Sequence, residues 1–107
     1  MTSRQVQFRS LANSDIEAAV EYYCVEGGDT LAVEFVDAIQ QAVERVRRLP
    51  NAGSLRFSYE LGIADLRAWR TQRFPYVIFC VPHGDRIDVL RVLHSQRDIP
   101  VAFADGS

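Results

Sequence analysis

Two apolar segments near the carboxyl end constrain the fold more than any other feature. Residues 76–82 and 86–94 are connected through Pro82-His83-Gly84-Asp85, whose residue types favour a tight turn. The pair therefore predicts a β-hairpin. Both segments are apolar at successive positions and not only at alternate ones, so neither has a face suited to water. We therefore expect them to be the central strands of a sheet.

Two helices are predicted before this hairpin. Ser14 and Glu17 have the spacing of a capping box, which predicts a first helix over 14–26, ended by Gly27-Gly28. A second helix is predicted over 30–49, because apolar residues recur at helical spacing and Pro50 stops them. The short glycine joint indicates that the two helices form an antiparallel hairpin.

The remaining segments complete an α+β domain. Residues 5–9 and 65–74 are predicted strands, whereas 55–59 are either a short strand or irregular. The expected order is β-α-α-β-β-β: a two-layer sandwich with the helical hairpin packed on one face of a mainly antiparallel sheet. We expect one domain over 1–107, with a mobile tail at 101–107. The predicted core is Val6, Phe8, Ile16, Val20, Phe35, Ile39, Val43, Val46, Ile78, Val89 and Val92.

Charge is unevenly distributed along the chain. All 12 basic residues are arginines, and the net charge is −2. The lack of lysine excludes Schiff-base chemistry and a P-loop cation. Residues 1–50 carry five arginines and eight acidic residues, whereas residues 45–73 carry seven arginines and two acidic residues. The second stretch predicts a locally basic surface that binds an anionic partner.

The sequence pattern argues against a membrane span, a signal sequence, a metal site and a cofactor motif. No apolar run is long enough to span a membrane and no signal sequence opens the chain, so we expect a cytoplasmic protein. Cys24 and Cys80 are far apart and are expected to be small buried hydrophobes. With only His83 and His94 beside them, no metal-ligand spacing exists, and no cofactor motif is found. His83 is expected to be solvated in its turn.

His94 is the first candidate for a functional residue. It follows the last apolar strand and precedes Arg97 and Asp98. A histidine can be a general acid or base near neutral pH. It can equally cap the end of the sheet by binding a backbone carbonyl or Asp98.

A second candidate surface is the predicted strand that contains Trp69. Arg67, Trp69, Thr71 and Arg73 alternate onto one face of this strand. Arginine and tryptophan together can hold phosphates and stack a base. They are also common residues of protein–protein interfaces. In a purely structural interpretation, Trp69 belongs to the core and the arginines pair with Glu44 or Asp88. These three interpretations stay open on the residues alone.

The ordered set of motifs resembles the RelE/ParE toxin superfamily, and within it the ParE-like branch. The resemblance covers about residues 5–100. Its strongest parts are Arg73-Phe74-Pro75-Tyr76 and the run Leu93-His94-x-x-Arg97-Asp98. Weaker parts are Phe8 with Ala12, Asp15-Ile16, Tyr22-Tyr23, Ala32 with Phe35 and Ile39, Leu49-Pro50-x-x-Gly53, Leu66-Arg67, Ile78, and Ile87-x-Val89-x-x-Val92.

The resemblance implies a toxin of a bacterial type II toxin–antitoxin (plasmid stabilisation) system. Such a toxin forms a hetero-oligomer with a cognate antitoxin, whose carboxy-terminal segment wraps it as helix and strand. ParE-like members inhibit DNA gyrase, with no cofactor or metal. On this basis the expected partner-binding residues are Arg67, Trp69, Arg73, His94 and Arg97.

Two alternatives follow from the same resemblance. RelE-like members cleave mRNA on the ribosome, and a nuclease would use His94 with Arg67, Arg73 and Arg91. An inactive relative would only bind its antitoxin. The sequence lacks lysine and has no tyrosine after His94, so it departs from the nuclease pattern. The resemblance therefore favours the gyrase inhibitor.

Overall fold

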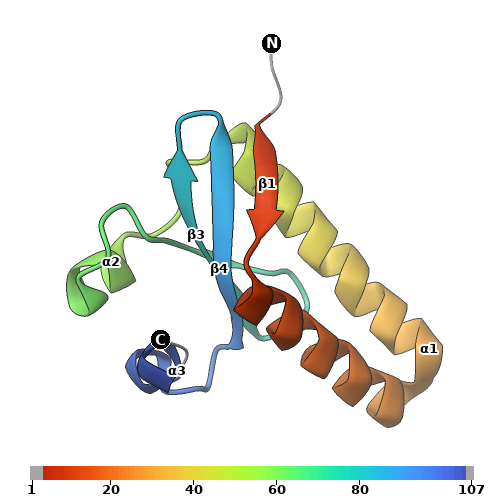
Figure 1. Cartoon of the computed structure of the whole chain (residues 1–107). Coiled ribbons are helices and arrows are strands. Elements are labelled where there is room, and N and C mark those ends of the chain that lie inside the picture. Colours follow the sequence, from red (N-terminus) through yellow and green to blue (C-terminus); the bar gives the residue numbers. More distant parts are fainter. Residues whose placement is uncertain (1–3, 106–107) are drawn as a thin grey trace.

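The computed structural model describes residues 4–105 of the chain and has an α+β fold. Four strands and three helices follow one another along the chain (Figure 1). In chain order they are β1 (Gln5–Phe8), α1 (Ser10–Arg48), α2 (Arg56–Leu61), β2 (Arg67–Arg70), β3 (Tyr76–His83), β4 (Arg86–His94) and α3 (Ile99–Asp105).

The sheet is built around the predicted hairpin of β3 and β4. The strand order is β1-β4-β3-β2, so β3 and β4 are central, as their apolar residues predicted. β2, β3 and β4 are antiparallel neighbours, whereas β1 runs parallel to β4 (Figure 1). β2 is shorter than the predicted strand over 65–74. It ends at Arg70, and residues 71–75 form the irregular connection to β3, which is closed by the Thr71 N–H donating to the Tyr76 carbonyl at 3.0 Å.

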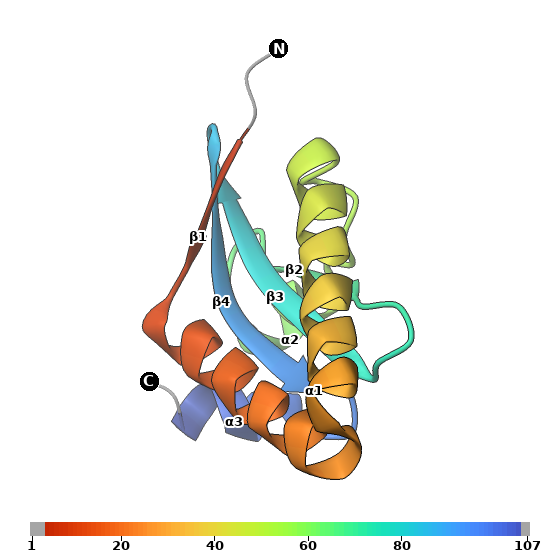
Figure 2. The ribbon, with the colours of Figure 1, turned by 90° about the vertical axis from the view of Figure 1, so that its right-hand side faces the viewer.

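Helix α1 contains both predicted helices, joined at Gly28. Gly28 has φ of 75° and ψ of −174°, and this positive φ suits glycine, which has no Cβ. The two resulting arms, 10–27 and 29–48, open away from this joint in Figure 2. The predicted start at Ser14 is wrong. The helix begins at Ser10, because the Asn13 N–H already donates to the Arg9 carbonyl at 3.0 Å.

The first core lies between α1 and one face of the sheet. All the predicted core residues belong to it: Phe35, Ile39, Val43, Val46, Ile78, Val89 and Val92 are buried, and Val6, Phe8, Ile16 and Val20 pack against them while partly exposed. Tyr23, Phe35, Phe74 and Tyr76 form an aromatic cluster near the joint, with ring centroids 5.0 Å apart for Tyr23 and Phe74. Leu49, expected to continue the apolar stripe, is exposed at the end of α1.

A second, smaller core lies on the opposite face of the sheet. There α2 and α3 lie beside the central strands (Figure 1), and Phe57 and Phe103 each pack edge-to-face on Phe79 at 5.3 Å. Of residues 55–59, expected to be a strand or irregular, 56–59 instead belong to α2, and Leu55 precedes it. Residues 101–105, expected in a mobile tail, belong to α3, and residues 106–107 lie outside the described part. The sequence therefore predicted the helices that cover one face of the sheet, but it did not predict α2 and α3 on the other face.

The position of the helix start gives a stability prediction. Ser14 lies inside α1 and is exposed. Alanine is a better residue than serine inside a helix, so Ser14→Ala should raise the free energy of unfolding by about 0.5 kcal/mol. If Ser14 capped the helix, the same change should lower it by about 1 kcal/mol. Urea unfolding followed by far-UV circular dichroism separates the two signs.

Candidate functional site

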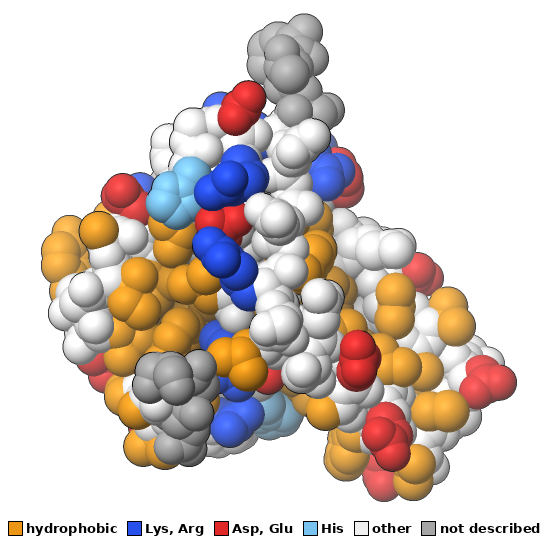
Figure 3. All heavy atoms as spheres, viewed as in Figure 1, with side chains coloured by type: hydrophobic (Ala, Val, Ile, Leu, Met, Phe, Trp, Pro, Cys, Tyr) orange, Lys and Arg blue, Asp and Glu red, His pale blue; other side chains and the backbone are white. Residues whose placement is uncertain are grey.

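Acidic residues are concentrated in α1, whose arginines lie in its last turn, whereas the other arginines lie outside this helix. Eight acidic residues and no basic ones lie between Asp15 and Glu44, so the helical hairpin is strongly negative. In Figure 3 the surface over α1, at the lower right, carries acidic and no basic side chains, and basic ones lie along the sheet and beside it. A polyanionic partner is therefore disfavoured over the hairpin and favoured away from it.

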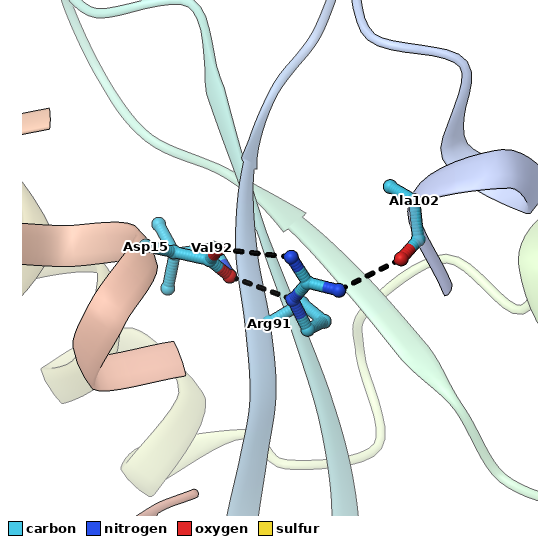
Figure 4. A network of polar contacts seen from close by, with 4 residues as sticks. All are labelled: Asp15, Arg91, Val92 and Ala102. Atoms are coloured by element: carbon cyan, nitrogen blue, oxygen red, sulfur yellow. Dashed lines mark hydrogen bonds and ion pairs between the residues drawn. The ribbon is translucent and has the colours of Figure 1, made fainter. Parts of the chain in front are cut away.

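Arg91 is buried inside the protein and does not lie on this basic surface. Its guanidinium binds Asp15 in a bidentate ion pair, with Nε–Oδ2 at 2.8 Å and Nη2–Oδ1 at 2.9 Å, and Nη1 donates to the Ala102 carbonyl at 2.8 Å (Figure 4). Asp15 also accepts the Val92 N–H at 2.9 Å. Arg91 therefore joins α1, β4 and α3, a structural role that its place in an apolar strand did not reveal.

Arg67 and Arg73 occupy different environments. Arg67 donates through Nη1 to the carbonyls of Asn51 (2.7 Å) and Gly53 (3.2 Å), so it holds the loop before α2. Arg73 follows β2 with φ of 73°, is exposed and pairs with Glu34 of α1 at 3.2 Å. The predicted alternation of both on one strand face is wrong, because the strand ends at Arg70.

The carboxylates that were expected to pair with these arginines bind others. Glu44 pairs with Arg47. Asp88 is buried, and two exposed arginines and an exposed histidine surround it: Arg9 at 3.1 Å, Arg86 at 3.2 Å and His83 at 3.6 Å. This cluster ties the end of β1 to the hairpin. No local pattern indicates this cluster, because its members are up to 79 positions apart.

Trp69 is half-buried in β2 and packs against the first core. Gly53 approaches its indole so closely that a Cβ there would lie 2.4 Å from Nε1. Gly53 is therefore required by packing. The structural interpretation of Trp69 as a core residue is supported, but the same residue also lines a surface groove.

The groove lies beside β2, between α2 and the segment that leads into α3. Its volume is about 570 Å³. Aromatic and aliphatic side chains, among them Phe57, Phe79 and Ile99, line it together with charged ones. The charged residues that line the groove are Arg56, Arg70, Arg97, Glu60 and Asp98. A groove lined by both apolar and polar side chains, with more arginines than acidic residues, can bind an amphipathic, acidic segment of another protein.

His94 lies at the end of β4 and is half-buried. Its Nδ1 accepts the Gln96 N–H at 3.1 Å, and its ring packs edge-to-face on Tyr76 at 5.3 Å. Arg97 is close by and lines both the groove and a smaller cavity that includes His94. Of the predicted site residues, the structure therefore brings together Trp69 with Arg97, and His94 with Arg97. Arg67, Arg73 and Arg91 line neither cavity.

The cysteines and the remaining ligand types add no site. Cys80 is buried, and desolvation raises the pKa of its thiol to about 12. Cys24 is exposed, contrary to expectation, and its thiol donates to Asp29 at 3.3 Å, which raises its pKa. Within residues 4–105 no group of three or more potential ligands could hold a metal ion. None of the described helices is both long and apolar enough to cross a membrane.

Comparison with known proteins identifies the family. No curated protein matches the chain. Among solved structures, one described as the chromosomal ParDE TA system from P. aeruginosa matches with a TM-score of 0.72 and 22% identity, over 88% of this chain and 98% of that chain. This likeness shows a shared fold. Over residues 6–99 the sequence also matches the family described as ParE toxin of type II toxin-antitoxin system, parDE. The chain therefore belongs to the ParE toxin family.

Proposed function

We propose that this toxin inhibits DNA gyrase in the cytoplasm by binding it, without catalysing a reaction, and that a cognate antitoxin neutralises it. Membership of the family implies the antitoxin. The observation that carries the choice of target is the position of Arg91. A nuclease would need His94 with free guanidinium groups around one phosphate, but Arg91 is sequestered by Asp15 and Ala102.

Arg67 and Arg73, which a nuclease would also use, bind other parts of the protein. Arg67 holds backbone carbonyls of the 51–53 loop, and Arg73 pairs with Glu34 on the acidic hairpin. Among the arginines of the described residues, Arg97 alone lines the small cavity that includes His94. Transition-state stabilisation of phosphate cleavage requires several donors aimed at one centre. This dispersion supports a binding function over a nuclease.

The groove between α2 and α3 is the proposed surface for the antitoxin. Its apolar lining suits the apolar side of an amphipathic segment, and Arg56, Arg70 and Arg97 suit acidic residues beside it.

Expression of the toxin alone should stop growth, and co-expression of the antitoxin should restore it. Because the arginines are exposed, the affinity should fall as salt increases.

A direct comparison of targets tests the proposal. The purified toxin should block gyrase supercoiling and trap gyrase-cleaved DNA, whereas primer extension on translating mRNA should show no new cuts. His94→Ala should retain gyrase inhibition, because no proton transfer is involved. Thermal unfolding of the same variant provides the control for folding.

The nuclease alternative predicts the opposite pattern. Codon-positioned cuts in mRNA, with gyrase unaffected, would overturn the proposal. In that case His94→Ala should lower the cleavage rate about 10²- to 10⁴-fold, the effect of losing a general acid or base. A folded wild-type protein that is harmless in cells and silent in both assays would indicate an inactive relative.

A further inference from the structure

A small cavity of about 250 Å³ lies between the first arm of α1 and the end of β4. Its cause is the length of β1. β1 pairs with β4 only as far as Val89, whereas β4 continues to His94. Within residues 4–105, no strand therefore flanks the last part of β4 on this side. The first arm of α1 passes there instead, and Asp15 accepts the Val92 N–H.

The lining of the cavity combines small apolar side chains with unpaired donors. Ala18, Ala19 and Val92 supply the apolar part. Arg97 is exposed and forms no ion pair with any residue of the described 4–105 range. It is thus available to a ligand.

Three further side chains in the lining can donate hydrogen bonds. His94 accepts the Gln96 N–H at Nδ1, so in the neutral ring Nε2 carries the hydrogen. The hydroxyls of Tyr22 and Tyr76 form no hydrogen bond within the described chain. Desolvation raises the pKa of Tyr76, which keeps its phenol protonated.

The single carboxylate of the lining is already neutralised. Asp15 binds the Arg91 guanidinium through both oxygens and also accepts the Val92 N–H. The available polar groups can thus all donate, although the two tyrosine hydroxyls can also accept, and one of the groups is the Arg97 cation. Such a set recognises an anionic group.

We propose that this cavity binds a segment of a partner protein that places an aliphatic side chain next to a carboxylate. The aliphatic group would contact Ala18, Ala19 and Val92, and the carboxylate would pair with Arg97 and accept from His94 or the tyrosines. The volume is below that typical of sites for cofactors and drug-sized ligands, and it suits a single side chain. The inference concerns ligand chemistry and is independent of whether gyrase is the target.

The surrounding charge favours a peptide over nucleic acid. The cavity borders the hairpin that carries eight acidic and no basic residues between Asp15 and Glu44. A phosphate backbone brings a series of negative charges to this surface, and each is repelled. A single carboxylate brings one charge and meets Arg97 directly.

The test uses N-acetyl-leucine as the probe, since it places an isobutyl group beside a carboxylate. NMR titration of the full chain should shift the methyl signals of Ala18 and Val92 and the ring signals of His94. N-acetyl-leucinamide, which lacks the charge, should bind about fivefold more weakly. Equal affinity for both compounds, or no shift of these signals, would overturn the proposal.

Variants assign the effect to the cavity. Arg97→Gln should remove the preference for N-acetyl-leucine, whereas Arg48→Gln, the same change at an exposed arginine near the end of α1, should retain it. Ala18→Leu, at an exposed helix position, should fill the cavity and abolish both titrations while the chain stays folded. A final titration uses the dinucleotide uridylyl-adenosine as the probe. If it shifts the same signals at lower concentration than N-acetyl-leucine, the ligand is nucleic acid and the proposal is wrong.

Discussion

Arg91→Met should lower the free energy of unfolding by about 3–5 kcal/mol, the cost of breaking a buried ion pair. The change leaves the Asp15 carboxylate, whose side chain is only 10% exposed, with the Val92 N–H as its single partner. It also removes the donor to the Ala102 carbonyl, so α3 loses one hydrogen bond to β4 while its apolar contacts in the second core remain. Since small domains have about 5–15 kcal/mol of stability, the loss should be visible as a large drop in the urea midpoint.

A double variant distinguishes the ion pair from general core damage. Asp15→Asn removes the buried charge but retains an acceptor for the Val92 N–H. Combined with Arg91→Met, it should be less destabilising than the sum of the two single changes, because the unpaired carboxylate is no longer present. Strict additivity, or a loss below about 1 kcal/mol for Arg91→Met, would show that the network in Figure 4 contributes little.

Charge reversal in the groove should have the largest effect on antitoxin binding. Arg56 and Arg70 both line the groove and are exposed, so changing both to glutamate should leave the fold intact. At low salt, Arg56→Glu/Arg70→Glu should weaken binding about 100-fold, since two attractive contacts become repulsive. Isothermal titration calorimetry at several salt concentrations measures both the loss and its screening.

A variant of equal charge on another surface is the control. Arg48→Glu combined with Gln40→Glu and Gln41→Glu also changes the net charge by −4, at exposed positions of α1 away from the groove. It should weaken binding only slightly and mainly through long-range repulsion. If the affinity for the antitoxin falls equally in both variants, the antitoxin does not occupy the groove, and net charge alone explains its attraction to the toxin.

Some features of this fold are set by short-range patterns. The apolar runs of β3 and β4 with their turn, the helical periodicity after Thr30 and the glycine joint are local, and each predicted its element. The family resemblance likewise rests on ordered local motifs, and the family match over 6–99 confirms it. Element ends were less well predicted. Ser14 and Glu17 have capping spacing, but the helix starts one turn earlier because the chain turns directly from β1 into α1.

The candidate site depended on contacts that no local pattern contains. Arg91 and Asp15 are 76 positions apart, and only the crossing of α1 over the unflanked end of β4 brings them together. In sequence Arg91 looks like a free cation near His94, but burial beside a carboxylate makes it structural. Similarly, Arg67 donates to the carbonyls of Asn51 and Gly53, and these residues are 16 and 14 positions away from it.

By itself, the sequence determined the α+β class, the central hairpin, the helical joint and the family. The tertiary structure alone decided that β1 is parallel to β4, that α2 and α3 lie on the second face, and that a cavity exists beside His94. The physical reason is the distance along the chain over which each interaction acts. Backbone propensity and periodicity act over a few residues, whereas strand pairing, ion pairing and the space left by a short strand depend on which distant segments meet.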